Sequence, residues 1–180
     1  MLDSRYQLGR CLKGVLLLAR GDYSGLAFLR DGLAWLREAR VRFNYVQLLG
    51  AFAKGLGEAG QIAGARAAID DAVEQAESRE EFWCLPELLR IKGEIMLLER
   101  LAGAGTLAEA HFQRALAMAR QQEALSWELR IAMSQAGLWR QSGRAAEGIE
   151  LVCAAYSRFT EGFGTADLKR ARAVIGDRTQ

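Results

Sequence analysis

The feature that most constrains this chain is a pattern of small and large apolar residues that recurs about every forty positions. Each copy contains a glycine, a small residue, a large apolar residue one helical turn later and another small residue. The first small residue of each copy falls at Gly25, Ala65, Ala108 and Gly148, and the middle interval is three residues longer than the other two. A fixed period of this size is typical of an array in which every unit is one helical hairpin.

Proline and glycine usage supports an all-α fold. A single proline in 180 residues disfavours sandwiches, barrels and long loops. The 19 glycines fit as turn residues or as points where helices approach closely. We therefore expect one helical-repeat domain over 1–180, with four antiparallel helix pairs and a C-terminal capping helix. The expected pairs are at about 4–39, 42–78, 80–122 and 126–159, with the cap at 165–176.

The sequence allows two starting points for the first helix of the third pair. Pro86 fits the first turn of a helix, but it would kink a helix that began near Arg79. Further along, Thr106 is expected to be the N-cap of a helix that runs to Gln122. The three extra residues of the middle interval are placed in the loop at 101–105, since loops change length at little cost.

Small residues also recur on the first helix of each pair. We expect them to face the small residues of the second helix where the two axes cross. A large residue one turn later is expected to fill the space between neighbouring pairs. The first-helix set is Gly14, Ala53, Gly93 and Ala136, opposite Gly25, Ala65, Ala108 and Gly148, and the large set is Leu29, Ile69, Phe112 and Val152.

Charge and composition narrow the function classes. The formal charge is +2 with both signs interspersed, so we expect no binding to nucleic acid. The longest apolar run, Val15–Ala19, is far too short to span a bilayer, and the start of the chain lacks a signal-peptide profile. Three widely separated cysteines are typical of a reduced, cytoplasmic protein.

The repeat resembles the tetratricopeptide repeat, which has the same order of small, glycine and aromatic positions. The period here is nearer forty than the standard length of about thirty-four residues, so longer helices are expected. The usual tryptophan near the repeat start and the proline at its end are missing, so the pattern is only tetratricopeptide-like. The resemblance implies a right-handed solenoid with a concave groove that is lined by the first helices.

A narrower resemblance covers residues 80 to 176. Three blocks carry it, at 83–94, 115–130 and 159–168. They look like the C-terminal helical-repeat region of large bacterial signalling ATPases, which are linked to adenylate or guanylate cyclase domains or to winged-helix transcription activators. Where this family more often has aspartate, the chain has Gly164. The resemblance implies a regulatory, protein-binding role, with the enzymatic domains elsewhere.

The sequence offers no assembled catalytic, cofactor or metal site. His111 is the only histidine and has no cysteine or histidine partner nearby in the sequence. The function we expect is a non-enzymatic scaffold that binds a protein or peptide. The alternative is a small-molecule sensor that controls an attached or partner ATPase, which would need an enclosed, partly aromatic pocket.

The groove implied by the tetratricopeptide resemblance gives the candidate contacts for a peptide or for a carboxylate-bearing ligand. They are Gln47, Lys54, Glu87, Arg90, Glu94, Arg130, Met133 and Arg140.

At the same positions the first pair offers only apolar residues, and an array does not end stably on an apolar face in water. We expect a second copy of the chain, or a preceding repeat, to cover that face. The face comprises Leu8, Cys11, Val15 and Leu18.

Overall fold

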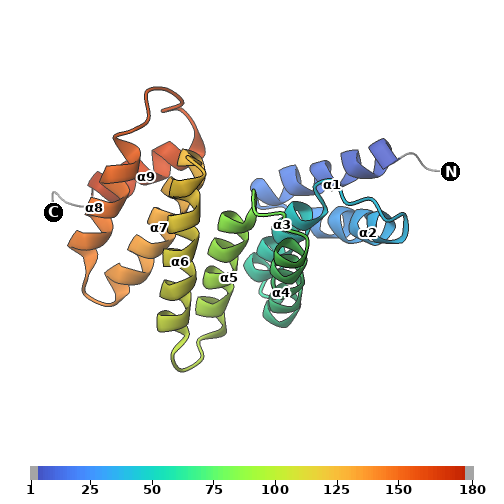
Figure 1. The fold of residues 1–180 in the computed structure, drawn as a ribbon, viewed down its shortest axis with the longest axis horizontal. Coiled ribbons are helices and arrows are strands. Elements are labelled where there is room, and N and C mark those ends of the chain that lie inside the picture. The colour runs from blue at the N-terminus through green and yellow to red at the C-terminus, as the bar shows by residue number, and fades with distance from the viewer. Residues whose placement is uncertain (1–3, 177–180) are drawn as a thin grey trace.

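The computed structural model describes residues 4–176, and over this range the chain is all-helical (Figure 1). The helices, in chain order, are α1 (Ser4–Ala19), α2 (Gly25–Glu38), α3 (Tyr45–Glu58), α4 (Ile62–Ser78), α5 (Leu85–Glu99), α6 (Ala104–Gln121), α7 (Leu125–Gln141), α8 (Ala145–Tyr156) and α9 (Ala166–Gly176).

Consecutive helices form pairs, and the pairs stack on one another. The first helices α1, α3, α5, α7 and α9 contact each other in succession and make one layer. Each second helix packs on the first helix of its own pair and on that of the next pair. In Figure 1 the turns within the last two pairs lie at the bottom, and the α8–α9 loop lies at the top. The expected all-α architecture is therefore confirmed.

The turns within pairs depend on glycine. Gly21, Gly60, Gly103 and Gly143 each follow a first helix and have φ between 76° and 79°. This left-handed conformation costs a residue with a Cβ atom about 1–2 kcal/mol, but it costs glycine almost nothing. The recurring glycine of the repeat therefore marks where each hairpin reverses direction.

The second helices α2, α4 and α6 also end on a left-handed residue, but this residue is not glycine. Arg40, Glu80 and Glu123 have φ of 55°, 57° and 55° after α2, α4 and α6. The next residue then donates its N–H to a carbonyl five residues back, as from Glu81 to Ala76. This closing pattern is a Schellman motif, and it satisfies the last carbonyls of each helix.

Small residues bring the helices of a pair together, as expected for the first and last pairs. A Cβ atom on Gly14 would lie 2.7 Å from the carbonyl oxygen of Gly25, and one on Gly148 would lie 2.9 Å from the Cβ of Ala136. Pair three is different, because a Cβ atom on Gly93 would lie 2.5 Å from Cε1 of Phe112. Phe112 therefore packs within its own pair instead of only between pairs.

The first residues of α3, α5 and α6 test the helix bounds that were expected from the sequence. The helix expected from Arg42 begins at Tyr45, because Asn44 has φ of 57° and interrupts the helical conformation. Pro86 lies in the first turn of α5, so the reading with a kinked helix from Arg79 is wrong. The expected Thr106 N-cap is also wrong, since α6 begins at Ala104 directly after Gly103.

Candidate functional site

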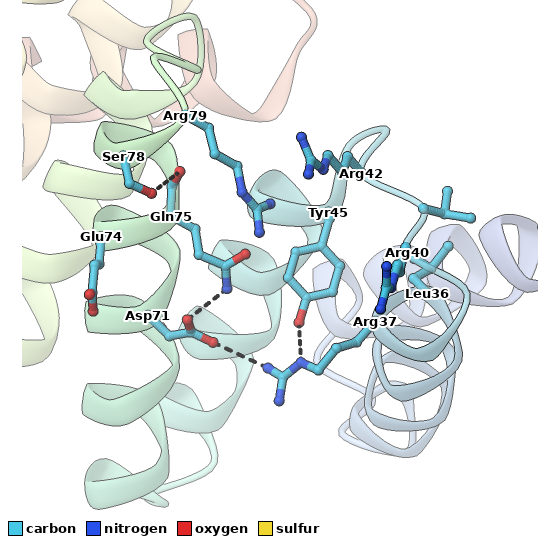
Figure 2. A pocket seen from close by; sticks show the side chains of 11 residues that line it. Leu36, Arg37, Arg40, Arg42, Tyr45, Asp71, Glu74, Gln75, Ser78 and Arg79 are labelled. Atoms are coloured by element: carbon cyan, nitrogen blue, oxygen red, sulfur yellow. Dashed lines mark hydrogen bonds and ion pairs between the residues drawn. The ribbon is translucent and has the colours of Figure 1, made fainter.

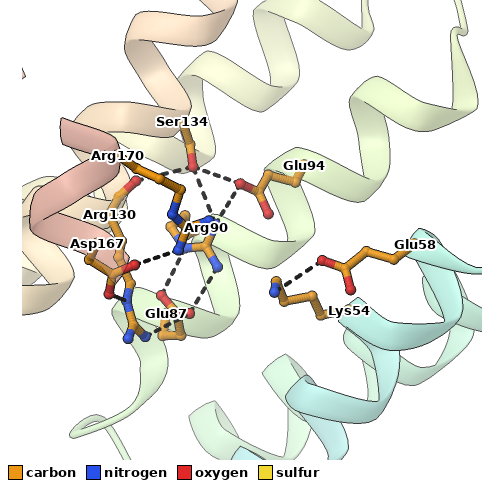
Figure 3. A network of polar contacts seen from close by, with 9 residues as sticks. All are labelled: Lys54, Glu58, Glu87, Arg90, Glu94, Arg130, Ser134, Asp167 and Arg170. Carbon is orange, nitrogen blue, oxygen red and sulfur yellow. Dashed lines mark hydrogen bonds and ion pairs between the residues drawn. The ribbon is translucent and has the colours of Figure 1, made fainter. Parts of the chain in front are cut away.

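The most extensive polar cluster of the first-helix layer is centred on Arg90 of α5 (Figure 3). The Arg90 side chain is only 7% exposed. Its Nε and Nη2 donate to the two carboxylate oxygens of Glu87, both at 2.8 Å, and its Nη1 donates to Oε1 of Glu94 at 2.5 Å. Spacings of three and four residues on one helix place all three side chains on the same face.

Ser134 connects this cluster to α7. Its hydroxyl donates to Oε1 of Glu94 at 2.7 Å and accepts from Nη1 of Arg90 at 3.2 Å. All three nitrogen atoms of the Arg90 guanidinium group thus have carboxylate or hydroxyl partners. A buried charge is stable only when its hydrogen-bonding groups are paired in this way.

Arg130 extends the network to α9. Its Nε donates to Oδ2 of Asp167 at 2.6 Å, and its Nη1 lies 3.5 Å from Oε1 of Glu87. Arg170 of α9 also donates to Asp167, at 2.5 Å. We call the set Glu87, Arg90, Glu94, Arg130, Ser134, Asp167 and Arg170 the α5–α7–α9 network.

The ionisation states in the network follow from competing effects. Burial alone would lower the pKa of Arg90, but the hydrogen bonds from the guanidinium to Glu87 and the charges of Glu94 and Glu87 outweigh burial and raise it. Burial would raise the pKa of Asp167, but hydrogen bonds and charges from Arg130 and Arg170 hold it below its ordinary value. The charged forms are therefore favoured, and the network is suited to fixing helices in place.

Four of the groove residues expected from the sequence lie together in this network: Glu87, Arg90, Glu94 and Arg130. They bind one another, which the sequence reasoning did not anticipate. Their charges are thus largely satisfied within the chain. Direct contact between these four residues and a ligand stays a prediction.

The other four groove candidates lie outside the network. Gln47 is exposed on α3, and Arg140 is exposed at the end of α7. Lys54 forms a salt bridge with Glu58 at 3.0 Å, and Met133 is half-buried against the hydrophobic cluster of α7, α8 and α9. These side chains occupy the same helix layer as the network, and a binding role for them also stays a prediction.

The expected self-association face needs correction. Cys11 is 0% exposed and Leu18 is 8% exposed, because α2 and α3 of the same chain cover them. Leu8 and Val15 are half-buried and pack against the core. The large apolar side chains of α1 that remain exposed are Tyr6, Leu12 and Leu16. Self-association through α1 stays a prediction.

A second polar feature is a cleft of about 450 Å³ between α2 and α4 (Figure 2). Tyr45 of α3 lies at its base, where the phenol oxygen accepts a hydrogen bond from Nε of Arg37 at 2.9 Å. Nη2 of Arg37 also pairs with Asp71 at 3.2 Å. Arg40, Arg42 and Arg79 line the cleft as well. We call this feature the α2–α4 cleft.

Other candidate chemistry is limited over residues 4–176. No group of three or more His, Cys, Asp or Glu side chains in this range is arranged to hold a metal ion. Burial, followed by the charges of Lys92 and Arg114, lowers the pKa of His111. None of the described helices has both the length and the apolar character needed to cross a membrane.

Several residues of both features could not be identified from the sequence. The spacing of Glu87, Arg90 and Glu94 was a usable signal for ion pairs along one helix. Ser134 and Asp167 carried no such signal, because they reach Arg90 and Arg130 from distant parts of the chain. Arg40, Arg42 and Arg79 of the α2–α4 cleft come from two loops about forty residues apart, so only the fold brings them together.

Comparisons with known proteins do not assign the chain to a family. No protein-family model matches the sequence, and no curated protein matches it either.

Proposed function

We propose that this chain is a non-enzymatic protein-binding module, built as a tetratricopeptide-like, right-handed solenoid with α9 as its cap. The observation that carries the proposal is the continuous layer of first helices, in which each helix contacts the next. Stacked helical pairs use such a layer as an extended binding surface. A protein or peptide partner would lie along α3, α5 and α7.

The α5–α7–α9 network supports this proposal by making part of the layer rigid. Arg90 and Arg130 join α5, α7 and α9 through ion pairs and hydrogen bonds. A surface that is already ordered loses less conformational entropy when it binds. Gln47 and Met133 lie on the same layer, on either side of α5, and are the proposed contacts best placed to report a partner.

The biological setting we propose is a regulatory segment of a cytoplasmic signalling or transcription-regulator system. Its support is the resemblance over residues 80 to 176, whose three sequence blocks now fall on α5, on α6–α7 and on the α8–α9 loop with the start of α9. In this setting the module would position a partner and would leave catalysis to other domains.

The alternative function is a small-molecule sensor that controls an attached or partner ATPase. A sensor needs an enclosed, partly aromatic pocket. The α2–α4 cleft is lined mainly by charged and polar side chains, with Tyr45 as its aromatic residue. A cleft of this composition favours a peptide partner over an enclosed apolar ligand.

Site-specific photocrosslinking in cells tests the proposed function. The photoreactive residue p-benzoylphenylalanine would replace Gln47 or Met133 in the first-helix layer, and Gln113, exposed on α6, would be the control site. The proposal expects the same partner to be crosslinked from Gln47 and Met133 but not from Gln113. Equal crosslinking from all three sites, or crosslinking from Gln113 alone, would contradict it.

A further inference from the structure

The α2–α4 cleft contains more positive charge than the chain neutralises. Four arginines line it (Arg37, Arg40, Arg42 and Arg79), against the two carboxylates of Asp71 and Glu74. Asp71 is already bound by Arg37 at 3.2 Å and by the side-chain amide of Gln75 at 2.6 Å. The cleft therefore has an excess of two positive charges.

Three of these arginines have no acidic partner within residues 4–176. Arg40, Arg42 and Arg79 are exposed and form no salt bridge with any of the described residues. Arg37, in contrast, is held in place by Tyr45 and Asp71. Figure 2 shows the three partner-free side chains placed around the cleft, with Arg79 on the α4 side and Arg40 on the α2 side.

The fold explains why a cleft forms at this point. Both α2 and α4 pack on α3, and the C-terminal ends of α2 and α4 border the cleft from opposite sides. The left-handed conformation of Arg40, with φ of 55°, turns the chain toward α3 directly after α2. The arginines therefore sit on closing turns that the helix ends themselves determine.

Exposed aromatic side chains flank the same two loops. Phe43 directly follows Arg42 and is 67% exposed, and Phe82 lies three residues after Arg79 and is 45% exposed. Arginine and aromatic residues are the side chains most enriched at protein–protein contacts. A ligand that pairs with the arginines could therefore also bury apolar groups beside the cleft.

We propose that the α2–α4 cleft binds an acidic peptide segment of a protein partner, through Arg40, Arg42 and Arg79. Guanidinium groups bind carboxylates through paired, charge-assisted hydrogen bonds. Three such groups spread around one cleft match carboxylates distributed along a peptide. The volume of about 450 Å³ accommodates a few side chains. The inference rests on the proposed function in one respect, namely that the ligand is a protein. The binding surface is different, because the α2–α4 cleft is not part of the first-helix layer.

Fluorescence anisotropy with synthetic peptides tests the inference. The probe is a fluorescein-labelled peptide that repeats Glu-Leu-Asp, and the comparison peptide repeats Gln-Leu-Asn. We expect the acidic peptide to bind and the neutral one not to bind. Each lost guanidinium should weaken binding about tenfold, so Arg42→Gln with Arg79→Gln should weaken it about a hundredfold. Replacing both by Lys keeps the charge but not the paired geometry, and should weaken binding less.

The matched control is Arg30→Gln, since Arg30 is exposed on α2 and does not line the cleft. It should leave the affinity unchanged. Arg42 and Arg79 are exposed and form no salt bridge in the part of the chain that the structure describes, so all variants should keep the wild-type melting temperature. The inference is overturned if the acidic peptide does not bind, or if the double Gln variant binds as well as the wild type.

Competition with inorganic phosphate and with citrate separates a peptide from a small anion. Displacement by either anion at the concentration at which the peptide itself half-saturates the protein would overturn the peptide assignment. The two proposals can fail separately. If Gln47 and Met133 crosslink a partner but the peptide does not bind, the cleft inference fails and the proposed function stands. If the acidic peptide binds but Gln47 and Met133 crosslink no partner, the proposed function of the first-helix layer fails and the cleft inference stands.

Discussion

The backbone of α5 at Gly93 lies against the ring of Phe112, because a Cβ atom on Gly93 would be only 2.5 Å from Cε1 of that ring. Phe112 is completely buried, and it holds the two helices of pair three together. The glycine is therefore a packing requirement of the repeat and not a flexible point in the helix.

Gly93→Ala should lower the free energy of unfolding by about 1–3 kcal/mol through overpacking against Phe112. The control is Gly137→Ala in α7, where an added Cβ atom would meet nothing within 4 Å. That change should raise stability by up to about 1 kcal/mol, because alanine favours a helix over glycine. Urea denaturation measures both variants, and equal effects would contradict the packing role of Gly93.

Arg90→Met should destabilise the chain by about 2–4 kcal/mol, because Glu87 and Glu94 lose their main cationic partner beside the core. Glu87 then keeps only the 3.5 Å contact with Arg130, and Glu94 keeps only the hydrogen bond from Ser134. Adding Glu87→Gln and Glu94→Gln to the same protein should recover much of this loss, since no uncompensated charge then remains. Urea unfolding is the suitable measurement, because urea does not screen charges. A loss below about 1 kcal/mol for Arg90→Met would mean that the network contributes little to stability.

Asp167 makes the attachment of α9 sensitive to acid. Its pKa in the folded chain lies below the ordinary value of 3.8, so the stabilisation it contributes is fully present above that pH. The contribution is lost as pH falls through the lowered pKa. At neutral pH the free energy of unfolding of the wild type should therefore be about 2 kcal/mol higher than that of Asp167→Asn. This difference should shrink below about pH 4. Urea unfolding across this pH range measures the difference.

The matched control is Glu161→Gln, since Glu161 is exposed in the α8–α9 loop. It should leave the pH profile of the unfolding free energy unchanged. A constant difference between wild type and Asp167→Asn at every pH would show that the Arg130 and Arg170 contacts do not depend on the carboxylate charge.

Glu80→Gly should stabilise the chain by about 0.5–1 kcal/mol. Glu80 has φ of 57°, which costs a residue with a Cβ atom about 1–2 kcal/mol. Glycine removes this cost but loses more backbone entropy on folding, which offsets part of the gain. The control is Glu81→Gly, because Glu81 is the next residue and does not have a positive φ. Thermal unfolding compares the two variants, and Glu81→Gly should be destabilising. A lower melting temperature for Glu80→Gly would contradict the strain at this turn.

The helix pairs could be predicted from the sequence because the repeat imposes the same local chemistry four times. Small residues, a glycine turn and a long amphipathic pattern all lead to the same hairpin. The start of α3 was misplaced because Asn44 takes a left-handed conformation that its apolar neighbours do not reveal. The three extra residues of pair three are not confined to the loop, because α6 begins within the stretch expected to be loop, at Ala104.

Prediction of the candidate sites was limited by the distance in sequence between their parts. The face shared by Glu87, Arg90 and Glu94 follows from helical spacing, and the sequence identified it. The burial of Arg90 and its contact with Ser134 depend on the packing of α5 against α7, which the spacing within α5 does not reveal. The burial of Cys11 by α2 likewise could not be read from the apolar pattern of α1 alone.

The central claim is that the layer of first helices binds a protein partner. Hydrogen exchange of the chain, with and without the partner captured by crosslinking from Gln47 and Met133, tests this claim most directly. We predict that the bound partner slows exchange of backbone amides in α3, α5 and α7. Slowed exchange confined to α6 and α8, with α3, α5 and α7 unchanged, would contradict it.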